Sequence, residues 1–370
     1  MVHRDLHQLT RGGICTLYRS LAAQMAARGH AVTLITQATP HPITLNGVEV
    51  ATLPRTEDLP AHRAAVADLL DRLRPDIIDC STWEAETLTY LNQPRTRRAP
   101  VMVRGEFSAA TLGAPDLASD EHELVHRADR VIAVSHYAAG DLASAYGIST
   151  PGIVHNGIDR DRFRPGPMSL PDSGSLVTLD RNGQPSDPQP IRALLRTGQP
   201  VPPWSRDAHR RTRLLWVGKI TPMKGWDHLE RIIDRLREIA VVTVLLGHSR
   251  ARCPVTIEPD RLTVLHDLND TDLPGLYRSA DWLLSTSRWE GFGLAIAEAM
   301  ASGTPVLLPE QLGTAPELLE AGGGYTYRDA DDIARILTWE PRPPAALPEQ
   351  FDWSVNAEAT LAHYRELTQG

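Results

Sequence analysis

The chain has 370 residues, of which 42% are hydrophobic and 23% are charged, and its formal net charge is −8 at pH 7. This composition is typical of a globular protein of about two domains, and it excludes a disordered or fibrous chain. The negative charge argues against a nucleic-acid partner, since such binding depends on clustered lysine and arginine.

The sequence also lacks a signal-peptide pattern and any apolar run of about 18 residues, so we expect no integral membrane segment. Three cysteines, Cys15, Cys80 and Cys253, have neither zinc-ligand spacing nor the even number typical of a disulfide framework. We therefore expect a reduced, cytoplasmic protein. The sequence leaves open whether it is a monomer or a dimer.

In the first half of the chain, helical and apolar segments alternate, which predicts a parallel, doubly wound sheet. Gly12-Gly13 opens an amphipathic helix that ends at Gly29, and a second helix is expected over residues 61–74. The expected strands are AVTLIT, VEVATL, DIID, VMV, VIAV and GIVH, at residues 31–36, 48–53, 76–79, 101–103, 131–134 and 152–155. A strand should also precede Gly12, so either the opening strand is very short or the chain starts a few residues upstream; we favour the second alternative.

Residues 166–210 are rich in Pro, Gly, Ser and Asp, which predicts a linker or an insertion with a small hairpin at SLVTLDRNGQP. The alternation then resumes, with a helix over 225–238 and a final helix over 353–368. The expected strands are LLWVG, VVTVLLG, LTVLH, WLLST and PVLLP, at residues 214–218, 241–247, 262–266, 282–286 and 305–309. We expect two doubly wound domains facing each other across a cleft, at 1–165 and 211–350, with residues 351–370 packing back on the first domain.

The most informative segment is SRWEGFGLAIAEAMASGTPV, at residues 287–306. Glu290 precedes Gly291, Phe292, Gly293 and Leu294, where a helix begins. Backbone N–H groups at a helix start can bind anionic or hydroxyl-rich ligands. Glu298, farther along that helix, has the two carboxylate oxygens needed to accept hydrogen bonds from the diol of a ribose. Each glutamate alone would be interpreted as a surface or capping residue, but the pair with its glycines indicates a binding site.

The only two lysines of the chain, Lys219 and Lys224, lie in the segment LLWVGKITPMKGWDHL. They follow Gly218, at the end of a predicted buried strand, where ligands of doubly wound sheets bind. Two ammonium groups at that edge are suited to a diphosphate. The alternative is a pair of solvated surface lysines.

Other motifs are less specific. Gly12-Gly13 allows close approach of the backbone, but a plain turn explains it equally well. Asp159-x-Asp161 and Asp270-x-Asp272 resemble the metal-binding pair of another nucleotide-sugar fold, but no further ligands lie nearby in sequence. We therefore expect no metal and no cofactor.

The sequence resembles the GT-B glycosyltransferases, specifically the retaining family 4, over nearly the whole chain outside 166–210. The resemblance is carried by RGGICTLYRSLAAQMAARGHAVTLIT, VSHYAAGDLASAYGI, VHNGIDRDRFRP, WVGKITPMKG, LYRSADWLLSTSRWEGFGLAIAEAMASGTPV, GTAPELL and the final helix that starts at Trp353. The element from Glu290 to Glu298 is the most specific of these matches.

The resemblance implies a donor site for a nucleoside diphosphate sugar, and we expect this sugar to be uridine-linked. Glu298 would bind the ribose, Glu290 with the backbone of 291–294 the transferred sugar, and Lys219 and Lys224 the diphosphate. The loop at Gly12-Gly13, together with Gly218, would complete this site. Family members usually have arginine at the position of Lys219, so this chain departs from the pattern while keeping the charge.

The resemblance also implies that the first domain binds the acceptor, and that the donor's anomeric configuration is retained. Where relatives often have a histidine, this chain has Arg104, which cannot act as a base. We therefore expect front-face substitution at Lys219, Lys224 and Glu290, without a metal. The acceptor would lie near Trp83, Glu84, Arg104 and Glu106.

The carboxylates of this region would suit a cationic aminocyclitol or amino sugar, as in antibiotic biosynthesis. The alternatives are a GT-B nucleotide-sugar epimerase and a glycosyltransferase that acts on a polysaccharide or a lipid.

Overall fold

The structure is a computed structural model that describes residues 1–6, 12–169, 171, 173–177, 187, 189–197, 211–246, 262–266 and 268–369. The chain forms two compact units. Unit 1 comprises Met1–Gly157 and Glu349–Gly370, and unit 2 comprises Ile158–Pro348. No helix in the described part of the chain is long and apolar enough to cross a membrane.

The first crossing between the units lies at residue 157, earlier than the expected boundary at 165. Gly157 packs so closely on the start of the final helix that a Cβ there would lie 2.2 Å from the backbone nitrogen of Trp353. The residues that follow contact unit 2, because Arg278 donates hydrogen bonds to the carbonyl oxygens of Arg164 and Pro167. Gly157 and residue 164 therefore belong to different units.

Unit 1 contains a parallel sheet in which the first residues of the chain join two groups of strands, the pair β1-β2 and the four strands β3-β4-β5-β6. Val2 bridges both Ile35 and Cys80, so residues 1–4 form the very short opening strand between β1 and β3. The strand expected before Gly12 is therefore present. The strands are β1 (Val32–Gln37), β2 (Val48–Leu53), β3 (Ile78–Ser81), β4 (Val101–Gly105), β5 (Arg130–Ala133) and β6 (Gly152–Ile153).

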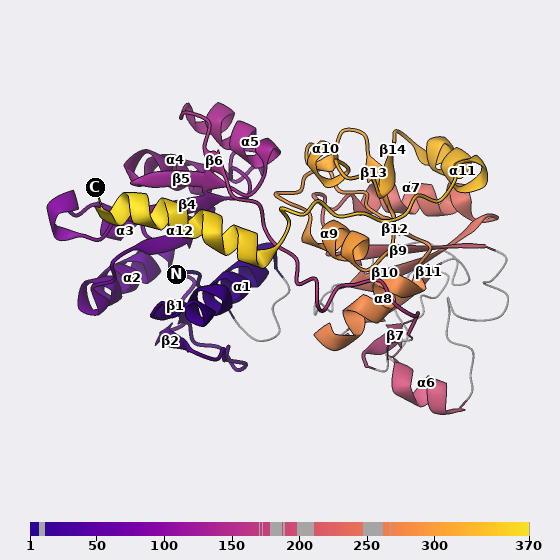
Figure 1. Ribbon diagram of the computed structural model, residues 1–370, viewed down its shortest axis with the longest axis horizontal. Coiled ribbons are helices and arrows are strands. Elements are labelled where there is room, and N and C mark those ends of the chain that lie inside the picture. Colours follow the sequence, from indigo (N-terminus) through magenta and orange to yellow (C-terminus); the bar gives the residue numbers. More distant parts are fainter. Residues whose placement is uncertain are drawn as a thin grey trace. The chain divides into compact units, whose positions relative to one another are not determined.

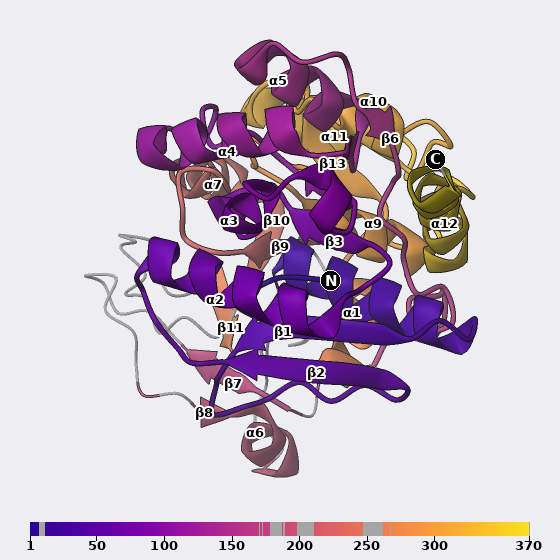
Figure 2. The same cartoon turned by 90° about the vertical axis from the view of Figure 1, so that its left-hand side faces the viewer.

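Helices cover both faces of this sheet. On one face, α2, α3 and α4 pack on apolar residues such as Ile35 and Val103. On the other face, α1 packs on α12, and α12 covers Met102. Figure 1 shows α12, in yellow, among the elements of unit 1, and Figure 2 shows β1 beside β2. The helices are α1 (Gly13–Ala27), α2 (Leu59–Leu73), α3 (Leu88–Leu91), α4 (Pro115–Arg127), α5 (His136–Tyr146) and α12 (Trp353–Gln369).

Unit 2 contains an eight-stranded sheet of order β14-β13-β12-β9-β10-β11-β7-β8. The strands are β7 (Ser175–Val177), β8 (Gln189–Pro190), β9 (Thr212–Gly218), β10 (Ala240–Leu246), β11 (Leu262–His266), β12 (Trp282–Leu284), β13 (Val306–Pro309) and β14 (Gly324–Tyr327). The helices are α6 (Ile191–Thr197), α7 (Trp226–Leu236), α8 (Leu273–Ser279), α9 (Leu294–Ala301), α10 (Ala315–Leu318) and α11 (Ala330–Trp339). α7 and α11 share a core with Trp216 and Trp282.

The α/β fold class predicted from the sequence is confirmed, with parallel pairing from β9 to β14. The segment 166–210 is more than a linker, because β7 pairs antiparallel with β11 and β8 pairs antiparallel with β7. The second strand begins at Gln189, beyond the expected hairpin, whose turn lies outside the described residues. β14 was not expected from the sequence.

Candidate active site

In unit 2, the chain runs from β9 outward to β10 and β11 and then returns to β12 on the other side of β9. The carboxyl ends of β9 and β12 therefore flank the point where the strand order reverses, which is where open α/β sheets bind ligands. Lys219 and Lys224 follow β9, and Glu290 follows β12. The topology brings these two predicted segments together.

The central contact of this site is an ion pair between Lys224 and Glu290. Lys224 Nζ lies 2.6 Å from Glu290 Oε1, and the two side chains are only 20% and 13% exposed. The hydroxyl of Ser287 donates a second hydrogen bond, of 2.7 Å, to the same carboxylate oxygen. Lys219, in contrast, is exposed. The two lysines therefore differ: one is fixed against a carboxylate, whereas the other extends into solvent.

The loop that contains the lysines is tied to the loop after β12. Thr286 accepts a hydrogen bond from the Trp216 indole and donates one to the carbonyl of Lys224. Gly225, with φ +64°, lies so close that a Cβ would be 1.9 Å from the Thr286 carbonyl oxygen. Only glycine allows both this conformation and this approach. These contacts fix the backbone from which Lys224 extends.

The glycine-rich segment leads into α9. Gly293 has φ +92° and precedes Leu294, the first residue of the helix. Phe292 is buried, whereas Gly291 and Leu294 are half-buried. Glu298 accepts a hydrogen bond of 2.7 Å from the hydroxyl of Tyr277. Gly218 ends β9 with its Cα against the Trp216 ring, since a Cβ there would lie 2.8 Å from it.

The sheet of unit 1 also reverses its strand order, between residues 1–4 and β3. Trp83 and Glu84 follow β3 at this point, and Glu84 and Ala85 have φ values of 62° and 48°. Two successive non-glycine residues in the left-handed region indicate a strained loop, and such strain is concentrated at functional sites. Arg63 donates two hydrogen bonds to the Glu84 carbonyl, and Arg4 lies 2.9 Å from the Glu84 carboxylate.

Glu86, the residue after Ala85, connects this loop to His3, Arg4 and His62. Its buried carboxylate lies 3.2 Å from His3 Nδ1 and 2.7 Å from His62 Nε2, and it accepts a hydrogen bond from the Arg4 backbone. Burial alone would raise the pKa of Glu86, but the hydrogen bonds from the two histidines lower it to about 2. Burial would lower the pKa of His3, but hydrogen bonds to Cys15 and Glu86 raise it to about 10. This cluster is not evident from the sequence, because its members are far apart in the chain.

Arg104, which was expected near the acceptor, is a buried residue of the unit 1 sheet. It is 1% exposed and forms a bidentate ion pair with Asp79, and its Nη2 donates to Thr360 of α12. Tyr18 and Tyr364 also donate to the Asp79 carboxylate. Burial lowers the pKa of Arg104, but Asp79 outweighs that effect and raises it. A charged side chain inside a sheet requires such a partner, so Arg104 has a structural role.

Gly12 and Gly13 lie at the start of α1, as expected from the sequence. The half-buried Glu106, which follows β4, extends toward this helix start, since its Oε2 lies 3.4 Å from the position of a Cβ on Gly13. Glu106 and the Gly12-Gly13 turn thus lie together at one edge of the unit 1 sheet. Residues 7–11, which precede the turn, are outside the described part of the chain.

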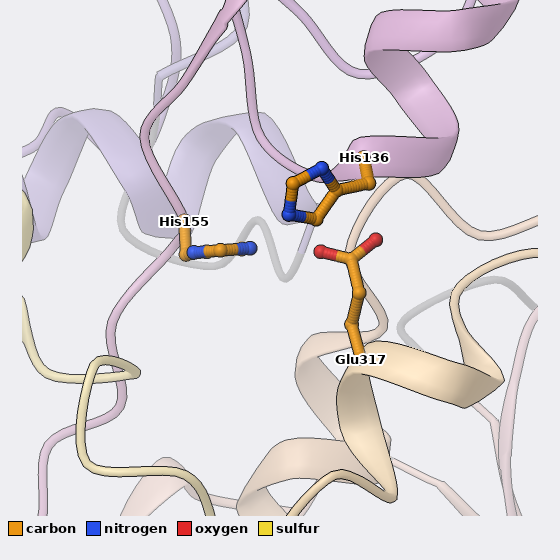
Figure 3. Close-up of side chains that lie close together, drawn as sticks. All are labelled: His136, His155 and Glu317. Atoms are coloured by element: carbon orange, nitrogen blue, oxygen red, sulfur yellow. The ribbon is translucent and has the colours of Figure 1, made fainter.

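Two histidines lie beside each other where α5 begins and β6 ends. The rings of His136 and His155 are 5.9 Å apart in an edge-to-face arrangement (Figure 3). His155 also contacts Phe351. Glu317, the third side chain in that view, belongs to α10 of unit 2.

The two Asp-x-Asp motifs have local roles. Asp159 accepts a hydrogen bond from the Arg162 backbone, and Asp272 accepts one from the Ser173 backbone.

Known proteins resemble this chain over both units. The family described as Glycosyltransferase Family 4 matches residues 11–162, and the family described as Glycosyl transferases group 1 matches residues 211–339. D-inositol 3-phosphate glycosyltransferase of Gordonia bronchialis is 26% identical over 97% of this chain and 84% of its own length. The enzyme of that name from Kineococcus radiotolerans is 26% identical over 97% and 91%.

Solved structures have the same fold. Sucrose-phosphate synthase from Thermosynechococcus elongatus superposes with a TM-score of 0.75 at 17% identity, covering 100% of this chain and 98% of that one. Anabaena Alr3699/HepE in complex with UDP and glucose has a TM-score of 0.63 at 17% identity, covering 100% and 96%. Together, the two family matches and the fold show that the chain belongs to the GT-B glycosyltransferases of family 4 and transfers a sugar from a nucleotide sugar.

Proposed function

We propose that the donor is a uridine diphosphate sugar and that unit 2 binds it at the carboxyl ends of β9 and β12. The observation that supports this proposal is the Lys224–Glu290 pair, because a diphosphate at the end of β9 would meet the half-buried cation of Lys224. Glu298, already oriented by Tyr277, would accept hydrogen bonds from the ribose. The structure of HepE with UDP, which has the same fold, supports this choice of nucleotide.

The proposed reaction proceeds with retention, by front-face substitution. As the bond between the sugar and the diphosphate breaks, negative charge develops on the leaving oxygen. Lys224, released from Glu290, and the exposed Lys219 would stabilise that charge, while a phosphate oxygen accepts the acceptor's proton. Fixed cations and N–H dipoles are effective for this purpose because they need no reorganisation during the reaction. Glu290 would then bind hydroxyls of the transferred sugar.

We propose that no metal takes part, since two lysines can supply the positive charge that a divalent ion would otherwise provide. Calorimetry with UDP in the presence and absence of a chelator tests this point. We expect the same affinity in both conditions. Binding that is lost with chelator and restored by a divalent ion would contradict the metal-free mechanism.

The acceptor is proposed to be a small hydroxylated molecule bound by unit 1, with an aminocyclitol or amino sugar of antibiotic biosynthesis as the more specific candidate. The structure pairs Asp79 with Arg104, Glu84 with Arg4, and Glu86 with His3. These three carboxylates therefore attract a cationic ligand less than the sequence suggested. Glu106, which extends toward the Gly12-Gly13 turn, would be one of the residues of unit 1 near the acceptor.

A screen of nucleotide sugars against an acceptor panel, read by mass spectrometry, tests the function. We expect a new glycoside that forms only when both substrates are present, and the anomeric proton signal should show the configuration of the donor. Conversion of the nucleotide sugar without an acceptor would favour an epimerase. Transfer only to a lipid or a polysaccharide would exclude the small acceptor.

A further inference from the structure

Two loops of unit 1 carry side chains that we expect near the acceptor. Trp83 and Glu84 follow β3, and Glu106 follows β4. Because β3 and β4 pair in parallel, both loops leave the same edge of the sheet. An acceptor that contacts both loops therefore depends on how they are held relative to each other.

A buried carboxylate of α4 links these two loops. Glu121 is 1% exposed, and its Oε2 accepts a hydrogen bond of 2.6 Å from the Ala109 backbone, in the loop after β4. The hydroxyl of Tyr146, in α5, donates to the same oxygen. The side chain of Thr82, directly before Trp83 in the loop after β3, interacts with the same carboxylate. One side chain thus connects both loops to α4 and α5.

The burial of Glu121 has a cost in free energy. Burial raises the pKa of this carboxyl group, although hydrogen bonding to Ala109, Thr82 and Tyr146 favours its charged form. An apolar side chain at this position would avoid the cost of burying a carboxylate, but it would leave the Ala109 N–H without this acceptor. The carboxylate is therefore suited to holding the loops rather than to filling the core.

Asp141, in α5, holds the loop after β4 at the neighbouring residue. It accepts a hydrogen bond of 2.7 Å from the Ser108 backbone and another from the Thr111 hydroxyl. The backbone N–H groups of Ser108 and Ala109 are thus bonded to carboxylates from two different helices. Two acceptors on separate helices fix both the position and the direction of the chain that follows Glu106.

We propose that Glu121 is a positioning residue, which fixes the loops after β3 and β4 so that their side chains meet the acceptor together. Asp141 assists by holding the loop after β4. This proposal rests on the proposed function, because it assumes that unit 1 binds the acceptor. Glu121 acts through the loops and touches neither substrate.

Acceptor kinetics test this role, with the nucleotide sugar and the acceptor that react fastest in the screen described above. Glu121→Ala should lower kcat/KM for the acceptor by on the order of tenfold to hundredfold, mainly through KM, because small displacements of binding groups cost this much. UDP affinity should not change, since unit 2 is proposed to bind the nucleotide. Glu121→Gln should recover most of the loss, because an amide oxygen can still accept hydrogen bonds from Ala109 and Tyr146.

Asp141→Ala is a second variant, which tests the role even if Glu121→Ala does not fold. It should raise the same KM, again without a change in UDP affinity. Hydrogen exchange gives an additional readout that needs no substrate. Residues 106–114 should exchange faster in both alanine variants than in the original protein, because backbone N–H groups of this loop lose their acceptors.

Tyr90→Phe is the matched control. The Tyr90 hydroxyl accepts a hydrogen bond of 3.0 Å from the Ala99 backbone, just before the amino end of β4 and thus away from the loop after that strand. Its loss should lower the unfolding free energy without changing KM for the acceptor.

Two results would refute the positioning role and leave the proposed function intact. One is an unchanged KM for the acceptor in the folded variants Glu121→Ala and Asp141→Ala. The other is an equal rise of KM in Tyr90→Phe, because the effect would then follow stability alone. No acceptor-dependent transfer by the original protein, with UDP binding intact, would contradict the proposed function itself.

Discussion

Replacing Lys224 by alanine tests whether the ion pair in unit 2 marks the place of the departing diphosphate. The change removes a cation that lies 2.6 Å from Glu290 and leaves a carboxylate of 13% exposure without that partner. Breaking a buried pair costs about 3–5 kcal/mol and breaking an exposed one about 0–1 kcal/mol. We place this half-buried pair between them, at about 1–3 kcal/mol of unfolding free energy. The protein should remain folded at room temperature.

The effect on turnover should be larger than the effect on folding. Loss of one fixed group that stabilises developing charge lowers kcat by on the order of 10²–10³. Lys224→Arg should recover only part of this loss, because a planar guanidinium does not occupy the place of a compact ammonium. Lys219→Arg should be tolerated better, because Lys219 is exposed and a larger cation fits there.

Steady-state kinetics, UDP calorimetry and urea unfolding separate these effects. Asp227→Asn is a suitable control: it breaks the exposed Arg288–Asp227 pair, of 2.7 Å, beside the lysine loop and should change neither kcat nor UDP affinity. Near-normal turnover of folded Lys224→Ala would refute the phosphate role. So would a loss of activity that follows the loss of folded protein alone.

Three further predictions concern stability and donor binding. Glu86→Gln should flatten the dependence of the unfolding free energy on pH. Glu86 stabilises unit 1 fully above its ordinary pKa of 4.5, and this contribution decreases as the pH falls toward 2. His3 contributes fully below pH 6.5, and its contribution is lost as the pH rises through 10. Urea unfolding at pH 3, 5.5 and 9 measures this effect. Gly225→Ala should abolish UDP binding in calorimetry, because the new Cβ would lie 1.9 Å from the Thr286 carbonyl oxygen. Tyr277→Phe should weaken UDP binding by about 1 kcal/mol, several-fold in Kd, with little change in kcat, because it removes a hydrogen bond of 2.7 Å to Glu298.

Each of these predictions has a control or a contradicting result. Gly322 has φ +87° and nothing within 4 Å of the position that a Cβ would occupy, so Gly322→Ala should add only backbone strain of about 1–2 kcal/mol and leave UDP binding intact. If it weakens binding as much as Gly225→Ala does, the steric argument is wrong. A pH profile of Glu86→Gln that matches the original protein would contradict the buried charge cluster. Unchanged UDP affinity in Tyr277→Phe would show that Tyr277 does not orient Glu298 for the nucleotide.

The sequence predicted the strands that are continuous apolar runs, such as VMV and LLWVG, because strands buried on both faces of a parallel sheet have this pattern. β14 escaped prediction because its sequence, GYTY, is only partly buried at the sheet edge and begins with glycine. β7 was anticipated in a hairpin, but its pairing with β11 depends on residues distant in sequence. Local pattern does not encode such pairing.

The same distinction applies to the site. Glu290, Lys224 and Glu298 were identified because glycines and a helix start surround them in the sequence. Their neighbours Ser287, Thr286 and Tyr277 have no such marker, and only the fold shows that they contact these residues. Arg104 was expected near the acceptor because of the resemblance, at the position where relatives often have a histidine. The resemblance did not show that Asp79 and the final helix bury this side chain.

The return of α12 to unit 1 has a consequence for synthesis on the ribosome. The buried Arg104–Asp79 pair needs Thr360 and Tyr364 to complete its hydrogen bonds. Until Thr360 and Tyr364 emerge from the ribosome, one face of the unit 1 sheet is uncovered and its ion pair lacks some of its hydrogen bonds, although the strands of unit 1 are synthesised first. Unit 2 is continuous from Ile158 to Pro348, so all its residues are synthesised before the final helix of unit 1. Domains generally fold as units during synthesis, so the part of the chain made second should complete its fold first, and the part made first should mature last.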